Sequence, residues 1–249
     1  MGSHLIDEDE DLDVGGFDSA GFTRQSLSSK ASLAAVIDHT LLKPEATRSQ
    51  VVKLCREAAE HRFACAMVNG VWAATACAVL AGAGVPVGAV VGFPLGASLG
   101  TTKRDEAAAL VKLGVHDVDM VLSIGLLKSG ENQAVQQEIR GVAEVAHEAG
   151  AILKVILETC LLTVEEKLRA SELAITAGAD FIKTSTGFST GGATVDDVAL
   201  MRGVAGGRCG VKASGGIRSL ADAKKMLEAG ANRIGASASV AIVGELVGG

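Results

Sequence analysis

The sequence predicts an α/β fold, a single (β/α)8 TIM barrel, on two observations. Eight short runs of Val, Ile, Ala and Leu alternate with longer segments that have helical spacing. One unit takes about 27 residues, so eight units fit the roughly 200 to 250 residues of a closed barrel. An open doubly wound sheet is disfavoured because its first strand needs a Gly-rich turn, whereas residues 37–42 read Ile-Asp-His-Thr-Leu-Leu.

The expected strands and helices follow in order along the chain. Each strand candidate is a short apolar run, and the eight runs span residues 33–37, 64–68, 86–91, 118–124, 152–157, 180–183, 210–213 and 233–234. Helix starts carry a capping box or a near relative of it, at Thr47, Thr102, Thr163, Thr194 and Ser219. Helix ends recur as a Gly before the next strand, where Gly can adopt the left-handed conformation, at Gly150, Gly178 and Gly230.

Two parts of unequal character make up the chain. Residues 1–29 hold seven acids and one base and show no periodicity, which predicts a disordered acidic tail that begins with a cloning remnant at residues 1–4. Residues 30–249 carry equal numbers of acids and bases and are expected to form the catalytic barrel domain. A domain of this length buries enough surface to fold without a disulfide or a structural metal.

Composition and charge narrow the function classes to small-molecule chemistry. The barrel region is net neutral and only 3% of the chain is aromatic, which disfavours a nucleic-acid partner. No apolar run reaches the length of a membrane span and the N-terminus lacks a signal peptide, so we expect a cytoplasmic protein without a membrane partner. The cysteines form no Cys-x-x-Cys pair, which indicates reduced and buried thiols at Cys55, Cys65, Cys77, Cys160 and Cys209.

Four charged residues, Asp119, Lys154, Lys183 and Lys212, stand inside apolar strand candidates that are consecutive along the chain. Successive lysines are 29 residues apart, one unit, so equivalent positions on neighbouring strands should bring them together. Each residue alone could equally be half of a buried ion pair, because Lys and Asp are rarely buried without a partner or a function. The four together favour a catalytic site at the carboxyl ends of the strands.

A cluster of lysines with one carboxylate supports chemistry that needs neither a metal nor a cofactor. Burial and neighbouring cations lower the pKa of a lysine, which makes its neutral amine a nucleophile. Such an amine condenses with a carbonyl to a Schiff base, an electron sink for breaking the adjacent carbon–carbon bond, while a second lysine and a carboxylate move protons. A metal site is disfavoured because the histidines include no i, i+4 pair and no His-x-His.

Gly-containing loops after the last two strand candidates predict a phosphate site. Residues 214–216 read Ser-Gly-Gly and residues 235–237 read Gly-Ala-Ser, in the two loops where barrels commonly bind phosphate on backbone N–H groups. The loop that follows Lys183 adds hydroxyl and backbone donors to the same end of the barrel. The candidate phosphate-binding residues are Thr186, Gly187, Gly215, Gly216 and Ser237.

Several blocks together resemble the deoxyribose-phosphate aldolase family of class I, Schiff-base aldolases, over roughly residues 31 to 240. The blocks are residues 37–44 (IDHTLLKP), 91–96 (VGFPLG), 154–159 (KVILET), 181–187 (FIKTSTG) and 211–217 (VKASGGI). The resemblance implies that Lys183 forms the Schiff base and that Asp119 and Lys212 handle protons. Supporting roles fall to Lys154, Asp38 and Thr40.

The resemblance also implies a reaction, the reversible cleavage of 2-deoxy-D-ribose 5-phosphate into acetaldehyde and D-glyceraldehyde 3-phosphate. Its partners are then a sugar phosphate and aldehydes, it needs no cofactor, and a homodimer is compatible with it. Two other interpretations stay open. One is a different Schiff-base aldolase or a transaldolase, and the other is an inactive barrel that only binds a sugar phosphate. The chain departs from the family pattern at Met67, Gly70, Ser123 and Ala238.

Overall fold

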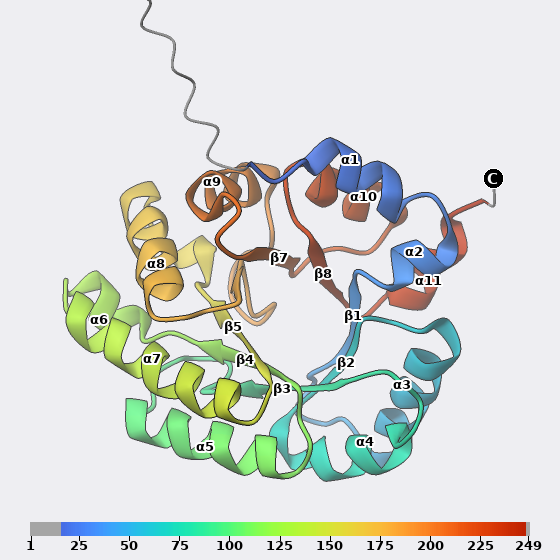
Figure 1. Ribbon diagram of the computed structural model, residues 1–249, viewed down its shortest axis with the longest axis horizontal. Helices are drawn as coiled ribbons and strands as arrows, with labels where there is room; N and C mark the ends of the chain where they lie inside the picture. Colours follow the sequence, from blue (N-terminus) through green and yellow to red (C-terminus); the bar gives the residue numbers. More distant parts are fainter. Residues whose placement is uncertain (1–15, 248–249) are drawn as a thin grey trace, which may run out of the picture.

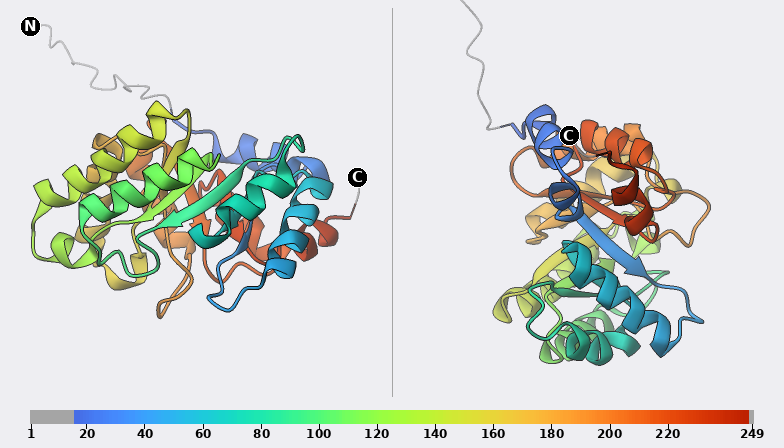
Figure 2. Two further views of the ribbon diagram at one scale, coloured as in Figure 1. Left: turned by 90° about the horizontal axis from the view of Figure 1, so that it is seen from below. Right: turned by 90° about the vertical axis from the view of Figure 1, so that its right-hand side faces the viewer.

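The computed structural model describes residues 16–247 and has a closed barrel of eight parallel strands (Figure 1). The strands follow chain order, and the last, β8 (Arg233–Ala236), pairs with the first, β1 (Ile37–Leu41), to close the barrel. Helices pack around the outside of the strands (Figure 2). The predicted (β/α)8 barrel is therefore confirmed. No helix within residues 16–247 is long and apolar enough to cross a membrane.

The other strands and the helices alternate as the sequence pattern predicts. The remaining strands are β2 (Cys65–Val68), β3 (Val87–Val91), β4 (Asp117–Val121), β5 (Ile152–Ile156), β6 (Phe181–Lys183) and β7 (Gly210–Ser214). The helices are α1 (Ser19–Ser26), α2 (Lys30–Ala34), α3 (Arg48–His61), η1 (Gly70–Trp72), α4 (Ala73–Leu80), α5 (Gly100–Lys112), α6 (Ile124–Lys128), α7 (Asn132–Glu148), η2 (Thr159–Leu161), α8 (Val164–Thr176), α9 (Val195–Ala205), α10 (Leu220–Glu228) and α11 (Ser239–Glu245).

Local sequence signals explain most of the helix boundaries. Complete capping boxes start α3, α8 and α10, as predicted, at Thr47, Thr163 and Ser219. Thr194 caps α9 by accepting a hydrogen bond from the Asp197 N–H. The prediction for Thr102 is wrong, because α5 already begins at Gly100 and Thr102 lies within its first turn. Positive φ angles end three helices as predicted, at Gly150, Gly178 and Gly230.

The first strand lies further along the chain than its apolar run predicts. The run at residues 33–37 begins inside α2, which starts after Ser29, a cap that accepts a hydrogen bond from the Ser32 N–H. β1 instead contains the polar sequence Asp-His-Thr at residues 38–40. These polar side chains hide the strand from a hydrophobicity pattern, because Asp38 is buried with partners in other strands and His39 is buried against Glu57 of α3.

Part of the predicted disordered tail forms a helix, which corrects the boundary at residue 29. α1 starts after Asp18, whose carboxylate accepts a hydrogen bond from the Gly21 N–H at 2.8 Å. The guanidinium carbon of Arg202 lies 4.2 Å from the centroid of the Phe17 ring, and α1 packs beside α10 (Figure 1). These partners are remote in sequence, so composition alone does not reveal them. Residues 1–15, which hold six of the seven acids in the predicted tail, lie outside the described residues.

The cysteines are free, and their burial differs from one to the next. Cys55 and Cys65 are buried as predicted, and Cys77 and Cys209 are half-buried. The expectation of a buried thiol is wrong for Cys160, which lies exposed in η2 after β5.

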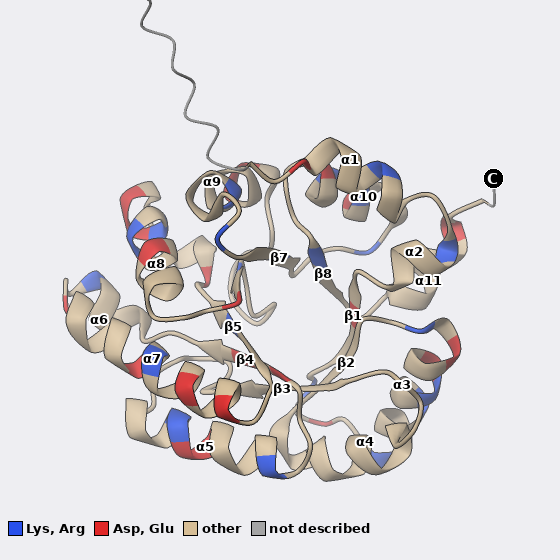
Figure 3. Ribbon diagram, viewed as in Figure 1, with Lys and Arg blue, Asp and Glu red and all other residues tan. Residues whose placement is uncertain are grey.

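Apolar side chains fill the layer between strands and helices, whereas charged side chains fill much of the barrel interior. Successive residues of a strand face opposite sides, and Ile182 and Val211 belong to the large apolar cluster that includes the helices. Their neighbours Lys183 and Lys212 face the interior, where they are buried. Figure 3 shows the charged positions on the strands as well as on the outer helices. The charged interior carries the candidate site.

Candidate active site

The three side chains predicted to be catalytic meet inside the barrel. Lys183, the last residue of β6, pairs in register with Lys212 of β7. The Nζ atoms of both lysines donate hydrogen bonds to Oδ2 of Asp119 on β4, each at 2.7 Å. All three side chains are almost completely buried. The barrel thus creates a water-poor cluster with two cationic groups on one carboxylate oxygen.

Lys154 lies one layer deeper than the equal spacing of the lysines predicts. In the pairing of β5 with β6, the partner of Lys183 is Ile156 rather than Lys154. This stagger arises because the strands of a closed barrel are tilted and shifted in register. Lys154 Nζ therefore bonds to Asp117 and lies 3.4 Å from Asp119 Oδ1. The spacing predicts the approach of Lys183 to Lys212 correctly and that of Lys154 to Lys183 wrongly.

The predicted supporting residues Asp38 and Thr40 lie on β1 beside Lys212. Lys212 Nζ donates a hydrogen bond to Asp38 Oδ2 at 2.5 Å, and Arg233 Nη1 donates one to Asp38 Oδ1 at 2.9 Å. Thr40 Oγ1 donates to the backbone carbonyl of Asp38 at 2.9 Å. Asp38 therefore links Lys212 to a further cation at the start of β8.

Sequence reasoning missed Asp117 and Arg233, which complete the interior charges. Each is the first residue of its strand, where a polar residue resembles the end of a turn. The period of two along a strand could have identified Asp117, because it lies two residues before Asp119 and on the same face. Arg233 is the register partner of Lys212, a relation that appears only once the strands are paired.

Burial makes Lys183 a weak base. It lowers the pKa of Lys183 to about 8 against the opposing charge of Asp119, and the positive charge of Lys212 adds to the lowering. Burial alone would also lower the pKa of Lys212, but Asp119 and Asp38 raise it. The pKa of Lys154 is raised in the same way by its carboxylates. Near neutral pH, Lys183 is therefore the lysine of this cluster that most readily supplies a free amine.

The carboxylates beside these lysines stay ionised. Burial by itself would raise the pKa of Asp119, but Lys183 and Lys212 hold it well below its usual range. Burial is likewise outweighed at Asp38, where Lys212 and two further cations lower the pKa to about 2. The site therefore joins a potential amine nucleophile to permanently ionised carboxylates and to a second, protonated lysine.

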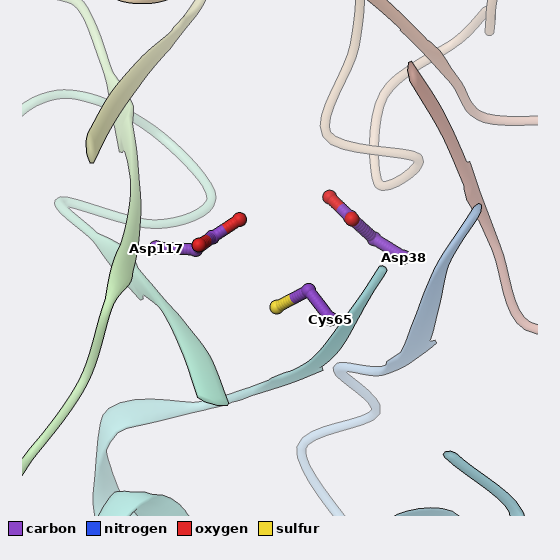
Figure 4. A group of neighbouring side chains, drawn as sticks. All are labelled: Asp38, Cys65 and Asp117. Carbon is purple, nitrogen blue, oxygen red and sulfur yellow. The ribbon is translucent and has the colours of Figure 1, made fainter. Parts of the chain in front are cut away.

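One group of interior side chains has donor atoms close enough for a metal. Atoms of Asp38, Cys65 and Asp117 lie within 4.8 Å of one another, and the side chains point into the same space (Figure 4). The set does not fit a metal, because both carboxylates already bond to cationic side chains. Burial raises the pKa of the Cys65 thiol far above its usual range, whereas a metal ligand must be a thiolate.

A cavity of about 430 Å³ lies at the carboxyl ends of the strands, with Lys183 in its wall. Gly215 and Gly216 have φ angles of 88° and 82°, and they let bare backbone line this cavity. A ligand in this cavity could therefore contact both this backbone and the Lys183 amine. All the predicted phosphate-binding residues line it, namely Thr186, Gly187, Gly215, Gly216 and Ser237.

Three further residues shape this cavity and were not predicted from the sequence. Lys43 and Arg218 line its rim, and their positive charges suit a phosphate dianion. Glu158 is buried behind the wall, with a left-handed backbone at φ 57°. Its carboxylate accepts hydrogen bonds from the Thr186 hydroxyl and, at 3.3 Å, from the Thr186 N–H. Glu158 thereby fixes the loop that follows Lys183.

A second buried charge cluster supports the loops without joining the cavity. Lys103 Nζ on α5 donates hydrogen bonds to Ser123 Oγ and to Glu138 Oε2, both at 2.9 Å. Ser123, one of the departures from the family pattern, also donates its N–H to Glu138 Oε1 at 2.6 Å and its hydroxyl to the Gly96 carbonyl at 3.1 Å. The cluster ties the end of β4 to α5, α7 and the loop after β3.

Replacement of Lys103 by Met is expected to destabilise the protein by about 3 to 5 kcal/mol, because it leaves the Glu138 carboxylate buried without its cation. Denaturant unfolding measures this free energy. The matched control is the double variant Lys103→Met/Glu138→Gln, which removes both charges and should recover a large part of the loss. A single variant as stable as the unsubstituted protein would show that the ion pair is not needed.

An eight-stranded barrel with a low-pKa lysine in the wall of its cavity defines a class of protein, the barrel enzymes equipped for Schiff-base chemistry. A family profile described as DeoC/LacD family aldolase matches residues 32–248. The chain belongs to this family of aldolases.

Named relatives agree with the family. The deoxyribose-phosphate aldolase of Bacillus mycoides (strain KBAB4) is 54% identical over 212 residues, 85% of this chain and 95% of the relative. That of Geobacillus sp. (strain WCH70) is 53% identical over the same shares. A solved structure, described as the unique tetrameric structure of deoxyribose phosphate aldolase from Aeropyrum pernix, is 36% identical with a TM-score of 0.85, covering 92% of this chain and 98% of that one.

Proposed function

We propose that the protein cleaves 2-deoxy-D-ribose 5-phosphate reversibly into acetaldehyde and D-glyceraldehyde 3-phosphate through a Schiff base on Lys183. One observation carries the proposal: Lys183 is a buried amine with a pKa of about 8, in the wall of the cavity and 2.7 Å from Asp119. The high identity to relatives named deoxyribose-phosphate aldolase supports this choice of substrate.

The reaction begins with addition of the neutral Lys183 Nζ to C1 of the open-chain sugar. Loss of water and uptake of one proton give a protonated imine. The C3 hydroxyl then loses its proton, the C2–C3 bond breaks, and D-glyceraldehyde 3-phosphate departs while the bonding electrons form an enamine. Protonation at C2 and hydrolysis release acetaldehyde and restore the amine. Asp119 and Lys212, the hydrogen-bond partners of Lys183, are the groups proposed to exchange these protons, in part through water.

The phosphate group is proposed to occupy the cavity between the loops after β6, β7 and β8. Backbone at Gly187, Gly215 and Gly216 would hold it, with the Thr186 and Ser237 side chains nearby. Lys43 and Arg218 would add positive charge at the rim. In this arrangement the phosphate anchors one end of the sugar and leaves its C1 carbonyl at Lys183.

A coupled assay tests the proposed reaction. Acetaldehyde released from 2-deoxyribose 5-phosphate is reduced with NADH by alcohol dehydrogenase, and the absorbance change reports the rate. Ketose phosphates serve as the comparison, because a transaldolase or another Schiff-base aldolase would prefer them. Substrate that binds but is not cleaved would identify an inactive sugar-phosphate receptor and refute the proposal.

Replacement of Lys212 by Leu is expected to lower kcat by at least about 10²-fold, the smaller loss for a general acid–base group. It should also raise the apparent pKa of imine formation, because the positive charge of Lys212 lowers the pKa of Lys183. The acid limb of the pH–rate profile would then move to higher pH. Lys212→Arg keeps the positive charge, so it should lower kcat but leave the acid limb of the profile in place. An unchanged profile in the Leu variant would show that the two lysines do not interact.

A cytoplasmic location and a homodimer stay predictions. The tetramer described for the Aeropyrum pernix relative supports an assembly of more than one copy. Exposed apolar side chains at Val71, Leu95 and Leu99 offer surface that an interface between copies could cover.

A further inference from the structure

The charged groups inside the barrel are unequal in number. Six strands contribute these carboxylates and bases, and the bases exceed the acids by one within the described interior. The acids are Asp38, Asp117 and Asp119, and the bases are Lys154, Lys183, Lys212 and Arg233. The inward residues of β2 and β3, such as Met67 and Val90, carry no charge, and the Cys65 thiol stays protonated because burial raises its pKa.

Half of this network lies away from the cavity, toward the amino ends of the strands. Lys154 bonds to Asp117, and Arg233 bonds to Asp38 and lies 4.0 Å from Asp117. The Phe181 ring lies under both cations, 5.7 Å from Lys154 Nζ and 5.4 Å from the guanidinium carbon of Arg233. Figure 4 shows Asp117 and Asp38 reaching toward each other from opposite strands. Neither Asp117 nor Arg233 lines the cavity, so they cannot touch a ligand held there.

We infer that Asp117 and Arg233 are positioning residues that set how readily Lys183 gives up its proton through the charge balance of the barrel interior. Arg233 favours the neutral amine, and Asp117 opposes it. The inference deepens the proposed function and rests on the proposed role of Lys183. Three carboxylates balance three cations, and a fourth buried cation would leave a net charge in a poorly solvated space, which is costly. One base must therefore give up its proton easily.

The contacts decide which base that is. Arg233 cannot lose its proton in a protein. Lys154 and Lys212 each contact two carboxylates or more within 4.0 Å. Among the described residues, Asp119 is the one carboxylate within 4.0 Å of Lys183 Nζ, and its contacting oxygen also accepts from Lys212. The positive charge of Lys183 is thus the one that carboxylates compensate least. This agrees with its lowered pKa and with the raised pKa values of Lys154 and Lys212.

Other titratable groups face the same region from the loops. Lys43 and Arg218 lie on the cavity rim and are exposed, so water screens their charges. Glu158 is buried, but its carboxylate is held by the Thr186 N–H and hydroxyl. These three groups are the same in every variant, so their effect on the pKa of Lys183 cancels when variants are compared with the unsubstituted protein.

The test uses two neutralising substitutions of opposite sign. Arg233→Met removes a cation, leaves three lysines against three carboxylates and should raise the apparent pKa of Lys183. Asp117→Asn removes an anion at nearly constant shape and should lower it. Each displacement should be roughly half a unit to one unit, less than a contacting charge produces, because both groups act from a distance. The double variant Arg233→Met/Asp117→Asn removes one charge of each sign, so its apparent pKa of Lys183 should lie near that of the unsubstituted protein. Arg233→Lys keeps the positive charge and should leave this pKa unchanged.

The readout is the yield of borohydride-trapped imine on Lys183 with acetaldehyde as the probe, measured against pH, with thermal unfolding recorded for each variant. A merely structural role would lower stability or amplitude but leave the pH midpoint in place. Midpoints that stay fixed in Asp117→Asn and Arg233→Met, or that move in the same direction, overturn the inference while the proposed function stands. Absence of trapping on Lys183 in the unsubstituted protein refutes the proposed function itself.

Discussion

Lys183→Arg is expected to abolish cleavage of 2-deoxyribose 5-phosphate, with a loss on the order of 10⁶-fold in kcat, as when a covalent nucleophile is removed. Arginine keeps a positive charge but stays protonated and cannot form an imine. Borohydride trapping on this position should vanish as well. The rate is measured by the coupled acetaldehyde assay and the adduct by mass spectrometry.

Two controls separate chemistry from packing. Lys183→Met has an unbranched side chain of similar length and should be just as inactive, so a loss confined to Arg would indicate overpacking in the buried site. Lys53→Arg, on an exposed side chain of α3, should keep full activity. Circular dichroism is expected to show a folded barrel for all three. Residual imine-dependent turnover in Lys183→Met would contradict the assignment of the nucleophile.

Free 2-deoxyribose is expected to react roughly 10² to 10⁶-fold more slowly in kcat/KM than its 5-phosphate. Each charge-assisted hydrogen bond to the phosphate contributes about 1.5 to 3 kcal/mol, and the free sugar loses two or three of them. The loss should affect kcat as well as KM, because phosphate binding also holds the reacting end of the sugar in place. Steady-state kinetics with the two sugars measure it.

Gly216→Asp should remove much of this preference, since it places a carboxylate where the phosphate is proposed to bind. Gly150→Asp is a matched control. Both glycines have positive φ, 82° and 70°, and open space where a Cβ would lie. Gly150 precedes β5 and lies at the amino end of the barrel, away from the cavity. Equal kcat/KM for both sugars on the unsubstituted enzyme would mean that these loops are only turns.

The sequence predicts the architecture well, because its signals are local. Alternating apolar runs and helical segments, three complete capping boxes and helix-ending glycines each act within a few residues. The same local reasoning fails at β1, where the buried polar residues Asp38 and His39 replace the apolar pattern. It also fails at α1, which packs against α10 from a distant part of the chain.

The sequence predicts which lysines of the candidate site lie at the cavity but not how the deeper charged residues are arranged. Lys183 and Lys212 share one register position, so equal spacing locates them correctly. Lys154 is displaced by the stagger of the strands, which depends on the closure of the whole barrel and not on any local pattern. Arg233 and Asp117 stand at strand ends, and only the pairing of all eight strands reveals their place in the charge network.

Sodium borohydride reduction of the unsubstituted enzyme with 2-deoxyribose 5-phosphate, followed by peptide mass spectrometry, tests whether Lys183 is the nucleophile. Reduction converts the imine into a stable secondary amine and records which lysine carried it. We expect one adduct, a two-carbon unit from acetaldehyde or the intact sugar phosphate, on the peptide that contains Lys183. An adduct on Lys212 or Lys154, or no adduct during active turnover, would contradict it.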